Sequence, residues 1–103
     1  MDLNFDIKEA QNSLLIILKG DLDAYTCNNL RENVEEMLKD RVVDVYVDGK
    51  DLDYIDSTGL GTIMGIYKIL NDEGKKIYLE NLKPNVRKMF KITSLDQVIT
   101  IKE

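Results

Sequence analysis

A short polar break between two apolar segments constrains the fold of this chain most strongly. The motif Asp56-Ser57-Thr58-Gly59-Leu60-Gly61 separates the β-branched run Val42–Val47 from a helical apolar pattern that continues to Leu70. The first run predicts a buried strand and the second predicts a helix. The two hydroxyls therefore lie at a helix start, where free backbone N–H groups and the positive end of the helix dipole tolerate added negative charge. Such a position suits a phosphate.

Length and composition limit how the chain can be organised. Its 103 residues fit a single hydrophobic core, which predicts one domain over residues 1–103. No apolar run approaches the roughly 20 residues that a membrane-spanning helix needs, and the N-terminus shows no signal-peptide pattern. Cys27 is the only cysteine, so an internal disulfide is impossible. These features predict a cytoplasmic protein with no membrane partner.

The ionisable residues exclude several functional classes. The formal net charge is −5, whereas a nucleic-acid-binding protein usually presents a basic face. The chain has no histidine, so a Ser-His-Asp triad, a Cys-His pair and a histidine-based zinc site are all excluded. A Gly-rich phosphate loop followed by lysine is also missing from the sequence. We therefore predict a protein that is not an enzyme, with no catalytic residue, metal, cofactor or direct nucleic-acid partner.

Apolar periodicity predicts an α/β fold with the element order β-β-α-β-α-β-α-β. Phe5 and Ile7 alternate with polar residues, as in an edge strand. The continuous apolar run Leu14–Leu18 predicts a strand covered on both faces, paired with the first strand in a hairpin that ends at Gly20. Because strands separated by helices are usually parallel, we expect a mixed sheet of four to five strands packed with three to four helices.

Spacing and stop signals predict three helices. One ends at Lys39, and either Asp23 or Thr26 could cap its start. The second spans Gly59–Leu70, and the third begins at Pro84, which suits a first helical turn.

The strands between these helices are predicted from β-branched and alternating runs. A loop over Asp48–Asp56 is expected to follow the strand Val42–Val47, with Leu52, Tyr54 and Ile55 anchoring the loop inward. The last two predicted strands lie within the ranges Lys76–Leu82 and Gln97–Ile101.

Taken together, three segments of the chain resemble the STAS domain family, specifically the bacterial anti-sigma factor antagonists. Gly20-Asp21-Leu22-Asp23, followed by Thr26, is similar to a family loop, and the motif at 56–61 is similar to the family phosphorylation motif. The tail from Glu80 to Leu95 is similar to the closing strand and helix of the family. The resemblance spans essentially the whole chain.

The resemblance implies a switch between partners. In this family an anti-sigma factor, which is also an ATP-dependent serine kinase, holds a sigma factor inactive. The unphosphorylated antagonist binds that kinase and frees the sigma factor, phosphorylation ends the binding, and a phosphatase restores it. The family phosphoacceptor follows the motif Asp and corresponds here to Ser57, with Thr58 as a weaker candidate. ATP and its metal belong to the partner kinase.

Local patterns leave several roles open. Ser57 could be a helix cap as well as a phosphoacceptor, and Asp56 could cap the helix, orient the hydroxyl or act as a weak base. Asp23 is equally a cap or a partner contact, and Thr26 is more typical of a cap. A STAS module that binds a small ligand or scaffolds a complex without phosphorylation is the alternative function. The residues predicted to contact the partner are Asp21, Asp23, Thr26, Asp56, Ser57, Thr58 and Gly59.

Acidic residues are frequent in the sequence around Ser57. They include Asp48, Asp51, Asp53 and Asp56. If the ends of parallel strands place Asp21 and Asp23 beside them, this end of the molecule is acidic before any modification. A phosphate would add about −1.5 to −2 charges to that face at pH 7.

Overall fold

The computed structural model describes residues 2–102 and confirms the predicted order of elements. Five strands form one sheet, in which β1 pairs antiparallel with β2 and each later pair of neighbours is parallel. The mixed sheet and the opening hairpin are thus confirmed: the β1–β2 pairing ends with Leu3 opposite Gly20, as predicted, and β2 itself continues to Leu22 beside β3. The strands are β1 (Leu3–Glu9), β2 (Ser13–Leu22), β3 (Asp44–Ile55), β4 (Ile77–Glu80) and β5 (Thr100–Lys102).

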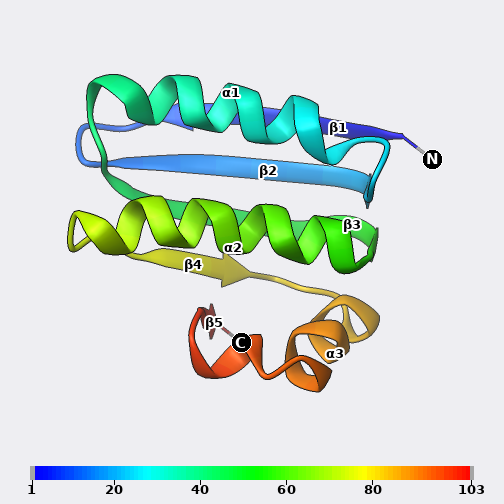
Figure 1. The fold of residues 1–103 in the computed structure, drawn as a ribbon. Coiled ribbons are helices and arrows are strands. Elements are labelled where there is room, and N and C mark those ends of the chain that lie inside the picture. Colours follow the sequence, from blue (N-terminus) through cyan, green and yellow to red (C-terminus); the bar gives the residue numbers. More distant parts are fainter. Residues whose placement is uncertain (1, 103) are drawn as a thin grey trace.

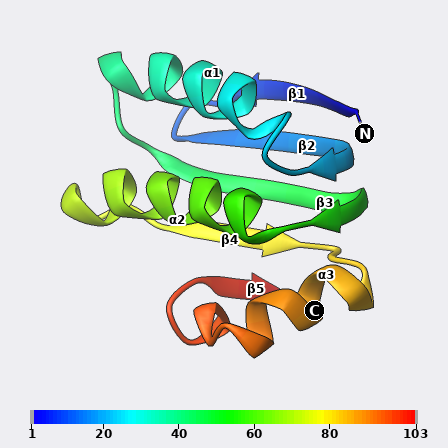
Figure 2. The same cartoon turned by 45° about the vertical axis from the view of Figure 1, so that its right-hand side comes forward.

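Two long helices cover one face of the sheet (Figures 1 and 2). α1 (Cys27–Asp40) lies over β1 and β2, and α2 (Ser57–Asp72) lies over β3 and β4. The core forms between the sheet and these helices, because both helices turn their apolar stripes toward the strands. α3 (Pro84–Ile92) begins at the predicted proline and is followed by the short 3₁₀ turn Leu95–Gln97.

The prediction that β2 is covered on both faces is wrong for the face of the sheet away from the helices. Leu14, Ile16 and Leu18 are buried under the helices, whereas Leu15 and Ile17 are only half-buried on the other face. In Figures 1 and 2 no helix of the described chain lies behind the sheet. The continuous apolar run is therefore covered on one face rather than on both.

The segment predicted as a loop over Asp48–Asp56 is strand instead. β3 continues to Ile55 because its backbone pairs with β2 along this length, with Leu52 opposite Gly20 and Ile55 opposite Leu22. Leu52 and Ile55 point inward as predicted, but Tyr54 lies outside the core and is 49% exposed. Two irregularities in the β2–β3 register, between Asp48 and Asp51 and between Leu52 and Tyr54, interrupt the alternation and allow both Leu52 and Ile55 to face inward.

The remaining boundaries differ by a few residues from those predicted. α2 begins at Ser57, two residues before the predicted Gly59, because Asp56 is extended and caps the helix. The last strand begins at Thr100, since part of the predicted segment forms the 3₁₀ turn. No helix within residues 2–102 is both long and apolar enough to cross a membrane.

Candidate functional site

The parallel topology brings the two motifs of the sequence together. β2 and β3 finish at the same edge of the sheet, and α1 and α2 begin there (Figure 1). The backbone N–H of Asp56 donates to the carbonyl of Leu22 at 3.3 Å. The backbone N–H of Ala24 donates to Asp56 Oδ2, also at 3.3 Å. The residues around Asp21–Thr26 and Asp56–Gly59 therefore share one site, which we call the switch end.

Asp56 rather than Ser57 caps α2. The carboxylate Oδ1 of Asp56 accepts the backbone N–H of Gly59 at 2.9 Å, and the backbone of Asp56 is extended, with φ −108° and ψ −174°. Ser57 is consequently the first helical residue. Among the roles left open by the sequence, capping by Asp56 is confirmed and capping by Ser57 is wrong.

The hydroxyl groups that follow the cap face solvent. Ser57 and Thr58 are both exposed at the first turn of α2. Within residues 2–102 no protein atom is hydrogen-bonded to Ser57 Oγ. The cap bond to the backbone N–H of Gly59 is made by Asp56 instead. The first N–H groups of a helix also have no partner within the helix. The side chain of Ser57 is thus accessible to a second protein and lies at the positive end of the α2 dipole.

The loop before α1 uses its polar side chains internally. Asp23 is only 4% exposed, and its Oδ1 accepts the backbone N–H groups of Tyr25 and Thr26 at 2.9 and 3.2 Å. The carbonyl of Asp23 also accepts the N–H of Cys27, the first residue of α1. This burial favours a loop-holding role for Asp23 over a direct partner contact.

Thr26 stands at the cap position of α1 but its hydroxyl does not cap the helix. Thr26 Oγ1 donates to the carbonyl of Asp21 at 2.9 Å and accepts the N–H of Asp23 at 2.9 Å. No side-chain cap bond is made by this residue. The predicted cap is therefore wrong, because the hydroxyl closes the loop back on itself.

Gly59 lets α2 approach β2 closely. A Cβ atom at this position would lie 2.4 Å from the carbonyl oxygen of Leu22 and 2.8 Å from Cγ1 of Ile55. Gly59 is buried, whereas a Cβ at Gly61 would have no atom within 4 Å. Gly59 thus positions the start of α2 and contributes little accessible surface of its own.

Fewer acidic residues reach the switch end than the sequence suggests. Asp48 pairs with Ile17 and Glu80 in the middle of the sheet, because β3 is extended. The seven residue-to-residue steps from Asp48 to Ile55 span about 23 Å at the usual rise of a strand. Asp56 directly precedes Ser57, and the half-buried Asp21 lies opposite Tyr54 near the end of β3.

Asp53, a further acidic residue of β3, has a basic partner. Its carboxylate forms an ion pair with Lys83, at the start of α3. The hydrogen bond to Asp53 raises the pKa of Lys83 above its ordinary value. This pair reduces the net negative charge beside the switch end.

Comparison with known proteins identifies the family. A family model described as the STAS domain matches residues 4–103. This chain is a member of the STAS domain family. An anti-sigma-B factor antagonist of Bacillus subtilis is 35% identical over 101 residues, covering 98% of this chain and 92% of that protein. An anti-sigma-B factor antagonist of Staphylococcus aureus is 32% identical over 103 residues, covering 100% of this chain and 95% of that protein. The chain therefore groups with the anti-sigma factor antagonists, whose names describe regulatory proteins.

Solved structures confirm the STAS fold. The anti-sigma factor antagonist SpoIIAA in its unphosphorylated form gives a TM-score of 0.80 at 20% identity, covering 97% of this chain and 88% of that chain. The structure of Bacillus SpoIIAA in its phosphorylated form gives a TM-score of 0.78 at 22% identity, and the match covers 97% of this chain and 92% of that chain. At this level of identity the likeness concerns the fold alone.

One exposed residue of the STAS domain was not predicted as part of the site. Tyr25 lies in the loop between Asp23 and Thr26, and its side chain is 88% exposed. The sequence patterns in this loop indicate helix caps and partner contacts at Asp21, Asp23 and Thr26, and they do not single out Tyr25. The only sequence signal that could have indicated Tyr25 as a site residue is its aromatic side chain among short polar residues.

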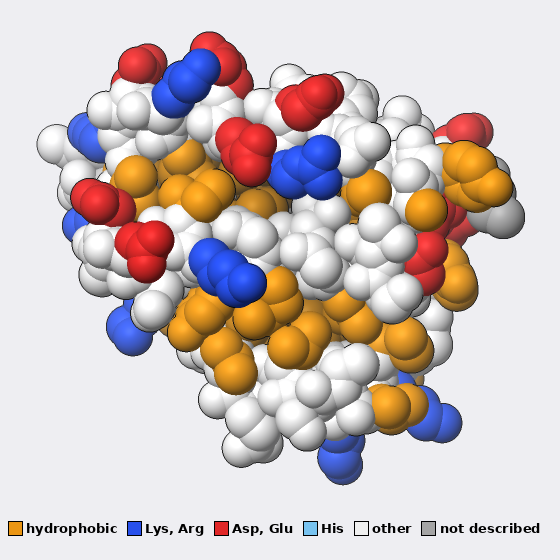
Figure 3. Space-filling model, viewed as in Figure 1, with side chains coloured by type: hydrophobic (Ala, Val, Ile, Leu, Met, Phe, Trp, Pro, Cys, Tyr) orange, Lys and Arg blue, Asp and Glu red, His pale blue; other side chains and the backbone are white. Residues whose placement is uncertain are grey.

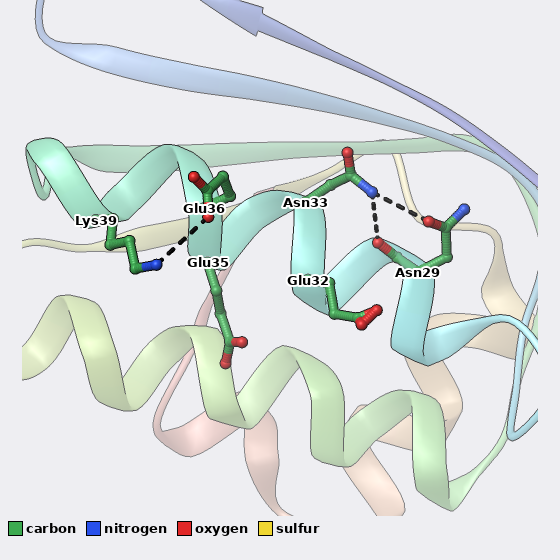
Figure 4. Close-up of a pocket in the computed structure, with 6 residues that line it drawn as sticks. All are labelled: Asn29, Glu32, Asn33, Glu35, Glu36 and Lys39. Atoms are coloured by element: carbon green, nitrogen blue, oxygen red, sulfur yellow. Dashed lines mark hydrogen bonds and ion pairs between the residues drawn. The ribbon is translucent and has the colours of Figure 1, made fainter.

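A wide hollow on the helical face of this STAS domain lies apart from the predicted site residues. It has a volume of about 520 Å³ and is lined by α1 side chains. Figure 4 shows Glu32 and Glu35 directed toward α2, while Glu36 pairs with Lys39. Among the described residues, no group of three or more Cys, Asp or Glu side chains is placed to hold a metal ion. An open acidic groove without a defined ligand offers less chemistry than the switch end.

Proposed function

We propose that this chain is an anti-sigma factor antagonist that is regulated by phosphorylation of Ser57. In its unphosphorylated form the switch end binds an anti-sigma factor that is also an ATP-dependent serine kinase, and a sigma factor is released. Transfer of phosphate to Ser57 Oγ ends this binding, and a phosphatase restores it. The names of the Bacillus subtilis and Staphylococcus aureus relatives support the antagonist role, and the phosphorylated form of SpoIIAA supports the modification.

The exposed hydroxyl of Ser57 is the observation that carries this proposal. Asp56 satisfies the cap bond at the start of α2, so the Ser57 hydroxyl is not needed to hold the helix. A kinase can therefore reach this oxygen without opening the core. The γ-phosphoryl group would form a new P–O bond to Oγ as its bond to ADP breaks, and the hydroxyl proton leaves to a base.

Electrostatics explain how one phosphate could end docking while the fold persists. The modification adds about −1.5 to −2 charges to a chain whose formal net charge is already −5. The α2 dipole stabilises an anion at its first turn by about 0.3–1 kcal/mol, so the phosphate is tolerated within the free protein. A partner surface that fits a small neutral hydroxyl would instead meet a bulky dianion beside Asp56. A loss of about 3–4 kcal/mol in binding corresponds to a weakening of roughly a few hundred-fold.

Intact mass after incubation with ATP and a purified anti-sigma factor kinase from the same organism tests this function. We expect one phosphate on the wild type and on Thr58→Ala, and none on Ser57→Ala. Thr58→Ala is a matched control because it removes the neighbouring exposed hydroxyl of the same helical turn. Stable binding of the kinase without any phosphate would favour the scaffold alternative, and phosphate on Thr58 alone would reassign the acceptor.

A further inference from the structure

Tyr25 is far more exposed than its aromatic character requires. Its side chain is 88% exposed, whereas Tyr46 and Tyr78 stack on each other with ring centroids 4.9 Å apart. Single exposed aromatic residues are common on protein surfaces, but tyrosine is enriched among the residues that dominate binding energies. The fold provides no covering contact for this ring within residues 2–102 that would explain its place in the loop.

The loop that carries Tyr25 is held in place on both sides. The backbone N–H of Tyr25 donates to Asp23 Oδ1 at 2.9 Å, and Thr26 Oγ1 donates to the carbonyl of Asp21 at 2.9 Å. The backbone N–H of Ala24 donates to Asp56 Oδ2 at 3.3 Å. Since the backbone is fixed before any partner arrives, docking on the ring orders little of the loop.

A hollow lined more by polar than by apolar atoms, with Asp2, Asn4 and Thr26 among its lining residues, lies directly beside the ring. It has a volume of about 390 Å³, and Tyr25 and Asn29 line it together with the half-buried Leu3 and Phe5 of β1. Figure 3 shows hydrophobic and acidic side chains together at the right-hand end of the molecule, where β2 and β3 finish in Figure 1. An exposed tyrosine ring beside a largely polar hollow that also contains apolar side chains offers a partner both an aromatic contact and hydrogen-bonding groups.

We propose that Tyr25 and this adjoining hollow anchor the partner kinase on the chain. This inference rests on the proposed function, and it names the part of the surface that supplies affinity. The hydrogen bond from Ala24 to Asp56 joins the Tyr25 loop to the residue directly before Ser57, so one partner surface can cover both. The ring contacts the kinase, and a side chain of the kinase that carries a polar group enters the hollow beside Asn4 and Asn29.

The kinase is favoured over a second copy of this chain as the occupant. Two copies meeting through this end would bring acidic residues such as Asp21 and Asp56 of both molecules together, and each chain already carries a net charge of −5. Like charges placed opposite one another disfavour such a contact. A partner with a basic or neutral polar surface fits the same features.

Affinity and phosphorylation kinetics of four proteins test the anchor. With the purified kinase as the probe, we expect Tyr25→Ala to bind about 30-fold more weakly than wild type, as for a hot-spot aromatic residue. Tyr25→Phe keeps the ring and should bind within about 3-fold. Ile92→Ala is the matched control, because Ile92 is 65% exposed on the last turn of α3 rather than in the loop, and should bind like wild type.

Kinetics separate docking from chemistry. Because Tyr25 does not touch Ser57 Oγ in the hydrogen-bond pattern of the switch end, Tyr25→Ala should raise the KM for this chain as phosphoacceptor by about 30-fold and leave kcat unchanged. The melting temperature should stay at the wild-type value, since the side chain is exposed. A structural role would lower the melting temperature instead.

Three results would overturn the anchor. Equal affinity of wild type and Tyr25→Ala, with Ser57 still phosphorylated, contradicts the anchor and leaves the proposed function standing. Self-association of the wild type that Tyr25→Ala abolishes would assign the surface to a second copy. A wild-type chain that neither binds the kinase nor accepts phosphate would overturn the proposed function and the anchor with it.

Discussion

The starts of α1 and α2 are built from similar residues but use their hydroxyls differently. Both helices follow a parallel strand at the same edge of the sheet, and each start carries an aspartate and a hydroxyl residue. At α1 the hydroxyl of Thr26 is bonded to Asp21 and Asp23 within the loop. At α2 the carboxylate of Asp56 makes the cap bond, and the hydroxyl of Ser57 faces solvent.

This difference separates a structural hydroxyl from a modifiable one. A hydroxyl that satisfies buried backbone groups cannot accept a phosphate without disrupting the loop that it holds. A hydroxyl displaced from the cap position by an adjacent carboxylate can be modified at little structural cost. The two helix starts therefore predict opposite responses to the same kind of substitution.

The largest expected effect concerns how closely α2 approaches β2. Gly59→Ala should lower the free energy of unfolding by about 2 to 3 kcal/mol, because its Cβ would clash with the backbone carbonyl of Leu22. Gly61→Ala is the control, since its Cβ enters open space, and should raise the free energy of unfolding by about 0.5–1 kcal/mol. Urea denaturation of both variants measures the contrast. Equal stabilities would mean that the start of α2 is not fixed by contact with β2.

A smaller effect compares the two hydroxyls directly. Thr26→Val should cost about 1–2 kcal/mol of unfolding free energy, because Asp23 N–H and the carbonyl of Asp21 lose a partner. Ser57→Ala should change it by less than about 0.5 kcal/mol, since the side chain is exposed. Chemical denaturation of both variants and the wild type at neutral pH measures these differences in unfolding free energy. A reversed order would remove the distinction between the helix starts.

The smallest expected effect is a pH dependence outside the two helix starts. Because the pKa of Lys83 is raised in the folded chain by its bond to Asp53, its contribution to stability is fully present below the ordinary lysine pKa of about 10.4. That contribution is lost as the pH rises through the raised folded value. The difference in melting temperature between wild type and Lys83→Met should therefore be constant between about pH 7 and 10 and disappear at higher pH. A difference that grows with pH would show the opposite sign of linkage.

Sequence patterns predict the fold best where apolar periodicity is uninterrupted. The core helix after Ser57, the helix that begins at Pro84 and the edge strand with Phe5 and Ile7 all follow from spacing. The second half of β3 was missed, because glycine and aspartate interrupt its alternation. Pairing with β2, a contact distant in sequence, keeps this segment extended.

The site was predictable in its location but not in its division of roles. Parallel strands place their carboxyl ends together, so the meeting of the segments around Asp23 and Asp56 follows from topology. Which residue caps α2, and where the hydroxyl of Thr26 points, depend on local backbone angles that residue types do not determine. The exposure of the Tyr25 side chain depends on how the loop folds, which the residue types of a short polar loop do not determine.

The most direct test compares the chain carrying phosphate on Ser57 with the unmodified chain. Affinity for the same purified kinase and the melting temperature are measured for both forms. The phosphorylated chain should bind roughly a few hundred-fold more weakly and melt within about 5 °C of the unmodified chain. Equal affinity of the two forms, or a loss of affinity that accompanies unfolding, would contradict a switch that acts at the surface of an intact fold.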